Sequence, residues 1–548
     1  MDTGTDNLKV DVYTIYKKKP PYINGLFFPY YEAKSHEGLF LAQITDSMLP
    51  EELANFMIKA DAVLHEFDCP LFLRPKCSYE TSNQCVFIYE HCNAGSLDSV
   101  KEPYNDDQIR DFLHQMVKSL SIIHNADYII RALTPSAIFM NREKNGQISY
   151  KLGDIMPILK MKEKSAPRFS PNEYIAPEVT AIDDPKKITG AADIYSLGII
   201  LKTLLTGSSE VMPKAVNPTL EHLIKRCTQP DYNTRIPLCD IIFHPFMSQP
   251  GRFDKCYLDH KFIGKGGFGK VFKAKSTIDG KECAVKLFDL NVNIELDRFD
   301  NTLESRELSL IHREITFMYH VQSAKDPGKN LGAIIDHFLD GKNFYIVMDY
   351  YAGGSLNKVI KLDKYEKGLP PKYVIKFAKE IILGLKSLHS KRIIHRDLKP
   401  ENILLTSEDL DKTELRVMDF GISKKIEDSG GEMSFLLESS SYAPPEIYSD
   451  GMFNWSYDIW AFGVILYEMI TGRHPAKRRD RIVEGKEMKG VVDTTGQNKL
   501  RKQGKIERVP IDKWPNLGKM YDLIEECVKL DKDQRKKAEK VIETLSKF

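Results

Sequence analysis

The sequence predicts two α+β units in tandem, and three observations support this. The chain has 548 residues, more than one compact domain usually holds. One order of segments occurs twice: IIRALTPSAIFM, KLGDIMPI, EYIAPEV and ADIYSLGIILKTLLTG between residues 129 and 207, then IIHRDLKPENILL, VMDFGIS, SYAPPEI and YDIWAFGVILYEMITG between residues 393 and 472. Strand-like runs precede each copy. Repetition on this scale indicates two copies of one fold.

Composition excludes several classes of protein. The formal net charge is +1 and acids and bases are mixed along the chain, so we expect no nucleic-acid partner. Nine cysteines occur without a C-x-x-C pair, and although Cys69, Cys77, Cys85 and Cys92 crowd one region, this usage is typical of buried thiols. The N-terminus lacks a signal-peptide pattern, and no apolar run reaches the roughly 18 residues of a membrane span. We therefore expect a cytoplasmic protein.

The elements of the first unit are read from apolar spacing. Alternating segments predict strands at 38–44 and 85–90, with a helix over 50–67 between them. A longer helix is predicted over 106–125, because its apolar residues fall on one face: Ile109, Phe112, Leu113, Met116, Val117 and Leu120. The boundary to the second unit falls at 248–254, SQPGRFD, which is too short for a free tether. We therefore expect the two units to be held against each other.

The second unit opens with a glycine-rich segment, FIGKGGFGKVFKAK, at 262–275. Glycines allow a backbone to approach phosphates closely. The alternatives are a hairpin without a ligand and a dinucleotide site, for which Asp289 stands at the distance of a ribose-binding acid. VFKAK and ECAVKLF read as two successive strands, whereas a dinucleotide loop must open a helix. The segment therefore predicts a glycine-rich turn that covers nucleotide phosphates, with Lys286 of ECAVKLF as the candidate ligand for them.

The stretch at 393–405, together with Asp419, carries groups that suit phosphoryl transfer. Such a reaction needs a carboxylate to orient the attacking hydroxyl, a cation near the transferred group, and oxygen ligands for a metal. Asp397, Lys399 and Asn402 lie within six residues of one another, and Asp419 opens the next loop.

With these motifs at these separations, residues 254–548 resemble the eukaryotic protein kinases. LKPEN matches the serine/threonine pattern, since tyrosine kinases usually carry a different loop there. The resemblance implies a small sheet-rich lobe and a larger helical lobe in each unit. It also implies transfer of the γ-phosphate of ATP to serine and threonine hydroxyls of protein substrates, with Mg²⁺ as the metal.

The resemblance also implies roles for single residues. Asp397 would orient the acceptor hydroxyl, Lys399 would offset charge, and Asn402 and Asp419 would hold magnesium. Lys286 would bind phosphates and pair with a glutamate on the next helix, where Glu307 and Glu314 are both candidates and Glu314 matches the family pattern better. The implied nucleotide-binding residues are Gly264, Lys265, Gly266, Gly267, Gly269, Val271, Ala284, Lys286, Met348, Asp349 and Tyr351.

Residues 1–250 resemble the same family without its chemistry. Four positions of the 393–405 motif, His395, Asp397, Lys399 and Asn402, are replaced by Ile130, Ala132, Thr134 and Ala137. Gln43 stands where the anchoring lysine is expected, and Asp154 survives in GDIM without the glycine that should follow it. The frame residues Glu178, Asp193 and Arg235 remain. The resemblance therefore implies a pseudokinase that regulates the second unit or recruits partners. For the chain as a whole, the alternatives are a non-catalytic scaffold and a tyrosine kinase in which a pseudokinase also precedes the kinase.

The loop between Asp419 and Glu446 is expected to be a phosphorylation switch. In the family, an arginine before the catalytic aspartate often pairs with a phosphate on this loop, and Arg396 has that place. Ser434 lies nearest the expected position. The alternatives are Ser429, Ser439, Ser440 and Ser441.

Overall fold

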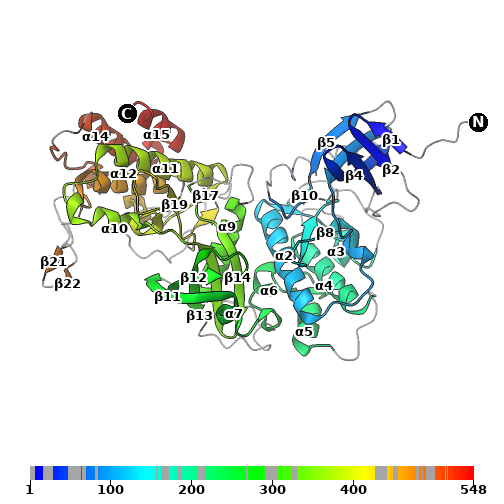
Figure 1. Cartoon of the computed structure of the whole chain (residues 1–548). Coiled ribbons are helices and arrows are strands. Elements are labelled where there is room, and N and C mark those ends of the chain that lie inside the picture. The colour runs from blue at the N-terminus through cyan, green and yellow to red at the C-terminus, as the bar shows by residue number, and fades with distance from the viewer. Residues whose placement is uncertain are drawn as a thin grey trace, which may run out of the picture.

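The protein is described by a computed structural model. It describes residues 7–16, 29–46, 63, 69–80, 84–155, 158–161, 172–181, 188–207, 216–266, 269–290, 306–322, 330–421, 423–425, 441–448, 454–476, 481–483, 486–488, 500, 502–511, 514 and 516–548. The predicted α+β class is confirmed: each unit combines an antiparallel sheet with a mainly helical lobe (Figure 1).

The first unit begins with a six-stranded antiparallel sheet of order β1-β2-β3-β4-β6-β5. The predicted strands at 38–44 and 85–90 are confirmed as β4 and β6, which pair directly. The predicted helix over 50–67 lies outside the described residues apart from Val63. The strands are β1 (Asn7–Val10), β2 (Tyr13–Tyr16), β3 (Tyr30–Ser35), β4 (Gly38–Asp46), β5 (Pro75–Glu80) and β6 (Gln84–Glu90).

The helical lobe of the first unit is built around α2 (Asp106–Asn125). Asn105 caps this helix: its side chain accepts from the Gln108 backbone, and the Gln108 side chain accepts from the Asn105 backbone. The predicted apolar face is buried as expected. The other elements are η1 (Leu97–Ser99), β7 (Tyr128–Ile129), η2 (Pro135–Ala137), β8 (Ile138–Arg142), β9 (Ile148–Leu152), β10 (Leu159–Lys160), α3 (Pro177–Ala181), α4 (Ala191–Thr206), α5 (Pro218–Cys227), α6 (Leu238–Ile241) and η4 (Pro245–Met247).

The second unit begins with a five-stranded antiparallel sheet of order β11-β12-β13-β15-β14. The glycine-rich segment joins two strands and opens no helix, so the dinucleotide-site alternative is wrong. The helix that follows β13 is α9 (Arg306–Gln322). The strands are β11 (Tyr257–Gly266), β12 (Gly269–Ser276), β13 (Glu282–Asp289), β14 (Ile334–Asp340) and β15 (Asn343–Asp349).

The second helical lobe repeats the first. A buried ion pair links Glu446 to Arg535 at 2.5 and 2.8 Å, as Glu178 is linked to Arg235 at 2.5 and 2.8 Å. Its elements are β16 (Gly354–Ser355), α10 (Leu356–Ile360), η5 (Asp363–Tyr365), α11 (Pro371–Ser390), β17 (Ile393–Ile394), η6 (Pro400–Asn402), β18 (Ile403–Leu405), β19 (Leu415–Val417), β20 (Lys424–Lys425), η7 (Pro445–Tyr448), α12 (Ser456–Thr471), β21 (Arg481–Val483), β22 (Lys486–Met488), α14 (Leu517–Cys527), η8 (Lys532–Gln534) and α15 (Ala538–Leu545).

The chain passes from one unit to the other along the edge of the second sheet. The Gln249 N–H donates to the carbonyl of Leu339 at 2.8 Å, and the Gly251 N–H donates to Asp340 Oδ1 at 2.8 Å. The short helix α7 (Arg252–Cys256) then leads into β11. In Figure 1 the second sheet lies between its own helical lobe and the helical lobe of the first unit. The junction is thus hydrogen-bonded to the sheet rather than a free tether.

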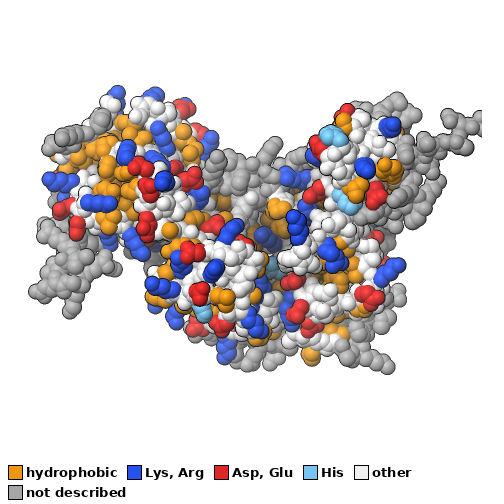
Figure 2. Space-filling model, in the orientation of Figure 1, with side chains coloured by type: hydrophobic (Ala, Val, Ile, Leu, Met, Phe, Trp, Pro, Cys, Tyr) orange, Lys and Arg blue, Asp and Glu red, His pale blue; other side chains and the backbone are white. Residues whose placement is uncertain are grey.

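The surface carries charges of both signs. On the face shown in Figure 2, lysines and arginines are interspersed with acids over both units. Within the described part of the chain, no helix combines the length and the apolar character that crossing a bilayer requires.

Candidate active site

Asp458, a buried residue on α12, holds the start of the loop from His395 to Asn402. The Asp458 carboxylate accepts from the backbone N–H groups of His395 and Arg396 at 2.9 and 3.0 Å. Arg396 has a positive φ of 65°, a conformation that costs free energy for a residue with a side chain. Because Asp458 binds both N–H groups, it stabilises this turn. The His395 ring also lies 2.9 Å from the Met418 carbonyl, which ties the loop to the segment before Asp419.

Asp397, Lys399 and Asn402 form one polar cluster in this loop. Lys399 Nζ lies 2.6 Å from Asp397 Oδ2, and Asn402 Nδ2 donates to the same oxygen at 2.9 Å. Asn402 Nδ2 also donates to the Asp397 carbonyl at 2.8 Å. Among the described residues, these hydrogen bonds engage one carboxylate oxygen. The other, Oδ1, can therefore accept from an incoming hydroxyl.

Lys286 lies between two carboxylates. Its Nζ is 2.8 Å from both oxygens of Glu314 on α9 and 3.7 Å from Asp419 Oδ1. Lys286 and Glu314 are buried. The structure therefore places Glu314, the glutamate preferred from the sequence, against Lys286.

The pKa values of this trio follow from burial and mutual attraction. Burial alone would lower the pKa of Lys286, but the charges of Asp419 and Glu314 outweigh it and raise the pKa. Burial raises the pKa of Glu314, against the opposing charge of Lys286. Burial would also raise the pKa of Asp419, but the charges of Lys286, His395 and Lys399 outweigh it and lower the pKa. Lys286 is thus a cation and Asp419 an anion at neutral pH.

The strands on either side of the glycine-rich turn pair up to Gly266 and Gly269. Gly266 ends β11 and pairs with Gly269, which begins β12. A Cβ at Gly269 would lie 2.3 Å from the Leu287 carbonyl oxygen, so the close approach of β12 to β13 requires glycine there. Gly267 lies outside the described residues. Gly264 and Lys265 lie on β11.

The remaining predicted nucleotide contacts lie on adjacent strands. Val271 of β12 pairs with Lys286, and Ala284 of β13 pairs with Met348 of β15. Asp349 ends β15, and Tyr351 follows it in the chain. The sheet thus brings Val271, Ala284 and Met348 close to the lysine.

The oxygen atoms that could hold a divalent cation belong to Asn402 and Asp419. Both hydrogen bonds of the Asn402 amide described above use its nitrogen, which leaves its carbonyl oxygen as a ligand. The Asp419 side chain is 27% exposed and ionised. Hard oxygen donors of this kind fit Mg²⁺.

The first unit has the same frame around different side chains. Asp193 of α4 accepts from the backbone N–H groups of Ile130 and Arg131 at 2.9 and 2.7 Å, as Asp458 does from His395 and Arg396. Arg131 repeats the positive φ at 70°. This equivalence places Ala132 where the second unit has Asp397. The loop geometry is therefore kept where the carboxylate is absent.

Strand register identifies the other equivalent positions. Tyr30 pairs with Gln43 as Val271 pairs with Lys286, and Tyr89 pairs with Leu41 as Met348 pairs with Ala284. Phe139 is the second residue after η2, as Leu404 is after η6. Gln43 therefore corresponds to Lys286. Tyr30, Tyr89 and Phe139 correspond to Val271, Met348 and Leu404.

Those three aromatic side chains form a buried cluster, which we call the aromatic plug. The ring centroid of Tyr30 lies 5.5 Å from that of Tyr89 and 5.0 Å from that of Phe139, in edge-on contacts. Tyr30 is 1% exposed and Phe139 is fully buried. The Tyr89 hydroxyl donates to Gln43 Oε1 at 3.1 Å. The plug fills the space between the sheet and the helical lobe with the protein's own side chains.

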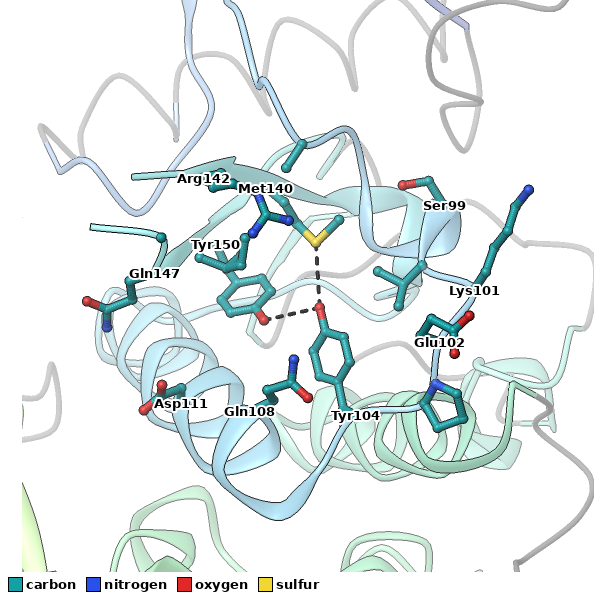
Figure 3. Close-up of a pocket in the computed structure, with 15 residues that line it drawn as sticks. Ser99, Lys101, Glu102, Tyr104, Gln108, Asp111, Met140, Arg142, Gln147 and Tyr150 are labelled. Carbon is teal, nitrogen blue, oxygen red and sulfur yellow. Dashed lines mark hydrogen bonds between the residues drawn. The ribbon is translucent and has the colours of Figure 1, made fainter. Parts of the chain in front are cut away.

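A separate cavity of about 490 Å³ lies at the N-terminal end of α2 (Figure 3). The Tyr150 hydroxyl donates to that of Tyr104 at 3.2 Å within it. The charged residues in its lining have both signs: Lys101, Glu102, Asp111 and Arg142. None of the residues predicted to act in phosphoryl transfer lines this cavity, so we assign it no part in that chemistry.

Sequence reasoning missed Asp458, the plug and Arg313. Asp458 could have been found, since ADIY and YDIW align the Asp in both repeats. The aromatic plug can be recognised only from strand register, and the weak sequence pattern before residue 92 does not predict that register. Arg313 lies on α9, where its charge helps to lower the pKa of Arg396.

Comparison with known proteins agrees with the repeat. The family model described as "Protein kinase domain" matches residues 51–247 and 257–545, most of the chain. Similar curated proteins include serine/threonine-protein kinase Nek4 of Mus musculus, 31% identical over 42% of this chain and 27% of its own length. Serine/threonine-protein kinase pakA of Talaromyces marneffei is 31% identical over 41% of this chain and 31% of its own length. Rhodopsin kinase of Rattus norvegicus is 28% identical over 52% of this chain and 47% of its own length. The matches therefore span less than half of each relative.

Proposed function

The chain belongs to the protein kinase family, and on that premise we propose that residues 254–548 are an ATP-dependent protein serine/threonine kinase and residues 1–250 a pseudokinase in a regulatory or recruiting role. One observation carries the proposal: the second unit holds both the Asp397–Asn402 contact and the trio of Lys286, Glu314 and Asp419. The N–H of Met418, next to Asp419, donates to the Asn402 backbone carbonyl at 2.8 Å and ties the two groups together. In the first unit, Ala132 and the aromatic plug occupy the corresponding positions. All nine cysteines are free thiols, which supports a cytoplasmic location.

In this mechanism, Asp397 orients the serine or threonine hydroxyl and accepts its proton. Lys399, 2.6 Å from Asp397, offsets the negative charge that develops beside it. Lys286 binds phosphates in the position that Glu314 fixes. When bound, ATP supplies the transferred group, and Asn402 and Asp419 would hold a Mg²⁺ ion that would offset its charge.

A phosphate-transfer assay on the purified full chain tests this function. With labelled ATP, Mg²⁺ and a generic protein substrate, we expect label on serine and threonine after hydrolysis to amino acids. Label on tyrosine would contradict the acceptor class. Absence of label from protein with and without a phosphorylated 419–446 loop would favour the scaffold alternative.

We also expect one nucleotide site in each full-length chain. The plug fills the first unit, which has Gln43 and Ala137 where the second has Lys286 and Asn402. Calorimetric titration with a non-hydrolysable ATP analogue and Mg²⁺ should therefore give a stoichiometry near one. Lys286→Met should weaken this single site. A second, magnesium-dependent site would contradict the pseudokinase assignment.

Phosphorylation of the loop between Asp419 and Glu446 is expected to raise activity. Burial and then the charge of Arg313 on α9 lower the pKa of Arg396 to about 10, so two cations lie close enough to repel. A phosphate would offset this repulsion. Ser429, Ser434, Ser439 and Ser440 lie outside the described residues, and Ser441 lies within them.

Mass spectrometry of active protein should find phosphate on at least one of these serines, and phosphatase treatment should slow turnover several-fold. A fully active protein whose loop carries no phosphate would rule out the switch.

A further inference from the structure

Helix α9 is packed on two opposite sides. Glu314 faces Lys286 on one side. His312, Thr316 and Tyr319, spaced by four and three residues, share another stripe of the helix. His312 Nε2 lies 2.9 Å from Thr316 Oγ1, and Thr316 and Tyr319 are buried. The side of α9 away from the ion pair is therefore covered as well.

The first unit supplies part of that cover through α2, which packs against α9. Lys118 Nζ of α2 lies 4.5 Å from the ring centroid of Tyr319. The Tyr319 hydroxyl lies 2.6 Å from His337 Nδ1, and the centroid of the His337 ring lies 4.5 Å from that of His114, which also belongs to α2, with the two rings tilted by 32°. Side chains of α2 thus contact α9 directly and also through β14.

These contacts meet at Asp336 on β14. Arg252 of the connecting helix α7 donates to Asp336 Oδ2 at 2.6 Å, and the Tyr257 hydroxyl donates to the same oxygen at 2.8 Å. His114 Nε2 lies 3.4 Å from Oδ1. Burial lowers the pKa of His114 to about 4 and that of His337 as well, so both rings are neutral at neutral pH and lie side by side without repulsion.

An apolar contact extends the same junction. Phe243 of the first unit lies 4.9 Å from Phe344 of β15 between ring centroids. Phe344 is fully buried and pairs in the sheet with Phe288, two residues after Lys286. One core of buried residues includes Ile109 and Phe112 of α2 together with Ile311 and Ile315 of α9. Close-packed cores resist deformation, so a shift of α2 is transmitted to α9.

We propose that the first unit is a docking platform for α9, on which His114 and Lys118 act as positioning residues that favour the paired state of Lys286 and Glu314. The proposal rests on the proposed function and gives the regulatory role a direction. With these contacts in place the ion pair is formed at 2.8 Å, so the platform supports the active arrangement. Loss of the platform lets α9 leave that position, which lowers the active population.

Charge reversal at Lys118 in the full-length chain tests the platform. Lys118→Glu places a carboxylate against the Tyr319 ring and is expected to reduce kcat/KM on a short generic peptide about tenfold. Lys118→Arg keeps the cation over the ring and should stay within about twofold of wild type. Lys101→Glu is the matched control, because Lys101 is an exposed lysine of the same unit that lines the cavity in Figure 3.

Hydrogen exchange supplies a readout that does not depend on catalysis. Lys118→Glu should raise amide exchange in α9 while α11 exchanges as in wild type. If Lys118→Glu fails to fold, His114→Ala, which only truncates a side chain, is judged by the same two measurements.

Wild-type exchange in α9 together with wild-type turnover would overturn the platform and leave recruitment as the role of the first unit. If even the wild-type chain transferred no phosphate, altered exchange in α9 would still support the platform, so its failure and that of the proposed function are distinguishable.

Discussion

Replacing Asp397 with asparagine is expected to slow phosphoryl transfer by about 10² to 10⁴-fold while nucleotide affinity stays within a few-fold of wild type. The substitution keeps the shape of the side chain but removes the group that accepts the proton of the acceptor hydroxyl. The contacts of the neighbours are consistent with a local effect. Asn402 Nδ2 also donates to the Asp397 backbone carbonyl, and Asp458 holds the loop through backbone N–H groups. Neither contact needs the Asp397 carboxylate.

The measurement is steady-state turnover together with calorimetric nucleotide binding on the same preparation. Asp363→Asn makes the same chemical change at an exposed acid on η5 and should leave both quantities unchanged. An Asp397→Asn protein that kept turnover within a few-fold of wild type would show that another group orients the acceptor. Loss of binding and turnover together would instead indicate a damaged loop.

Local pattern was sufficient where an element is specified by its own residues. The spacing of Ile109, Phe112 and Met116 predicted α2, and the two successive strands predicted after the glycine-rich turn are β12 and β13. The candidate active site of the second unit could be predicted because its residues stand in two short motifs. One runs from His395 to Asn402, and the other contains Asp419.

Packing between distant segments was not predictable in this way. Tyr30 lies in a region without a clear sequence pattern. Its equivalence to Val271 follows only from the strand register, which pairs it with Gln43. Lys118 reads as an ordinary charged residue on an amphipathic helix, although it covers Tyr319 some 200 residues later. Such contacts depend on how two folded lobes pack together, and the spacing of residues within one segment does not predict this packing.

Lys286→Met is expected to reduce turnover by about 10² to 10³-fold, the usual effect of removing one preorganised charge from a site of this kind. Methionine keeps much of the length of the lysine side chain but leaves Glu314 buried without its cation. Burial already raises the pKa of Glu314, so the carboxyl is expected to take up a proton in the variant, and α9 loses the attraction that fixes it. Lys275→Met, at an exposed position on β12, is the matched control and should retain wild-type turnover.

Adding Gln43→Lys to the Lys286→Met protein should restore neither turnover nor nucleotide binding. The first unit would regain a cation at the position that register equates with Lys286, but that cation would face the aromatic plug, with Ala132 and Ala137 where the second unit has Asp397 and Asn402. One charge cannot replace the acceptor-orienting carboxylate, a metal ligand and the space for a nucleotide. Turnover and magnesium-dependent binding of the double variant measure this directly. Recovery of either would mean that the plug opens to admit a nucleotide, and that the first unit is a dormant site rather than a filled one.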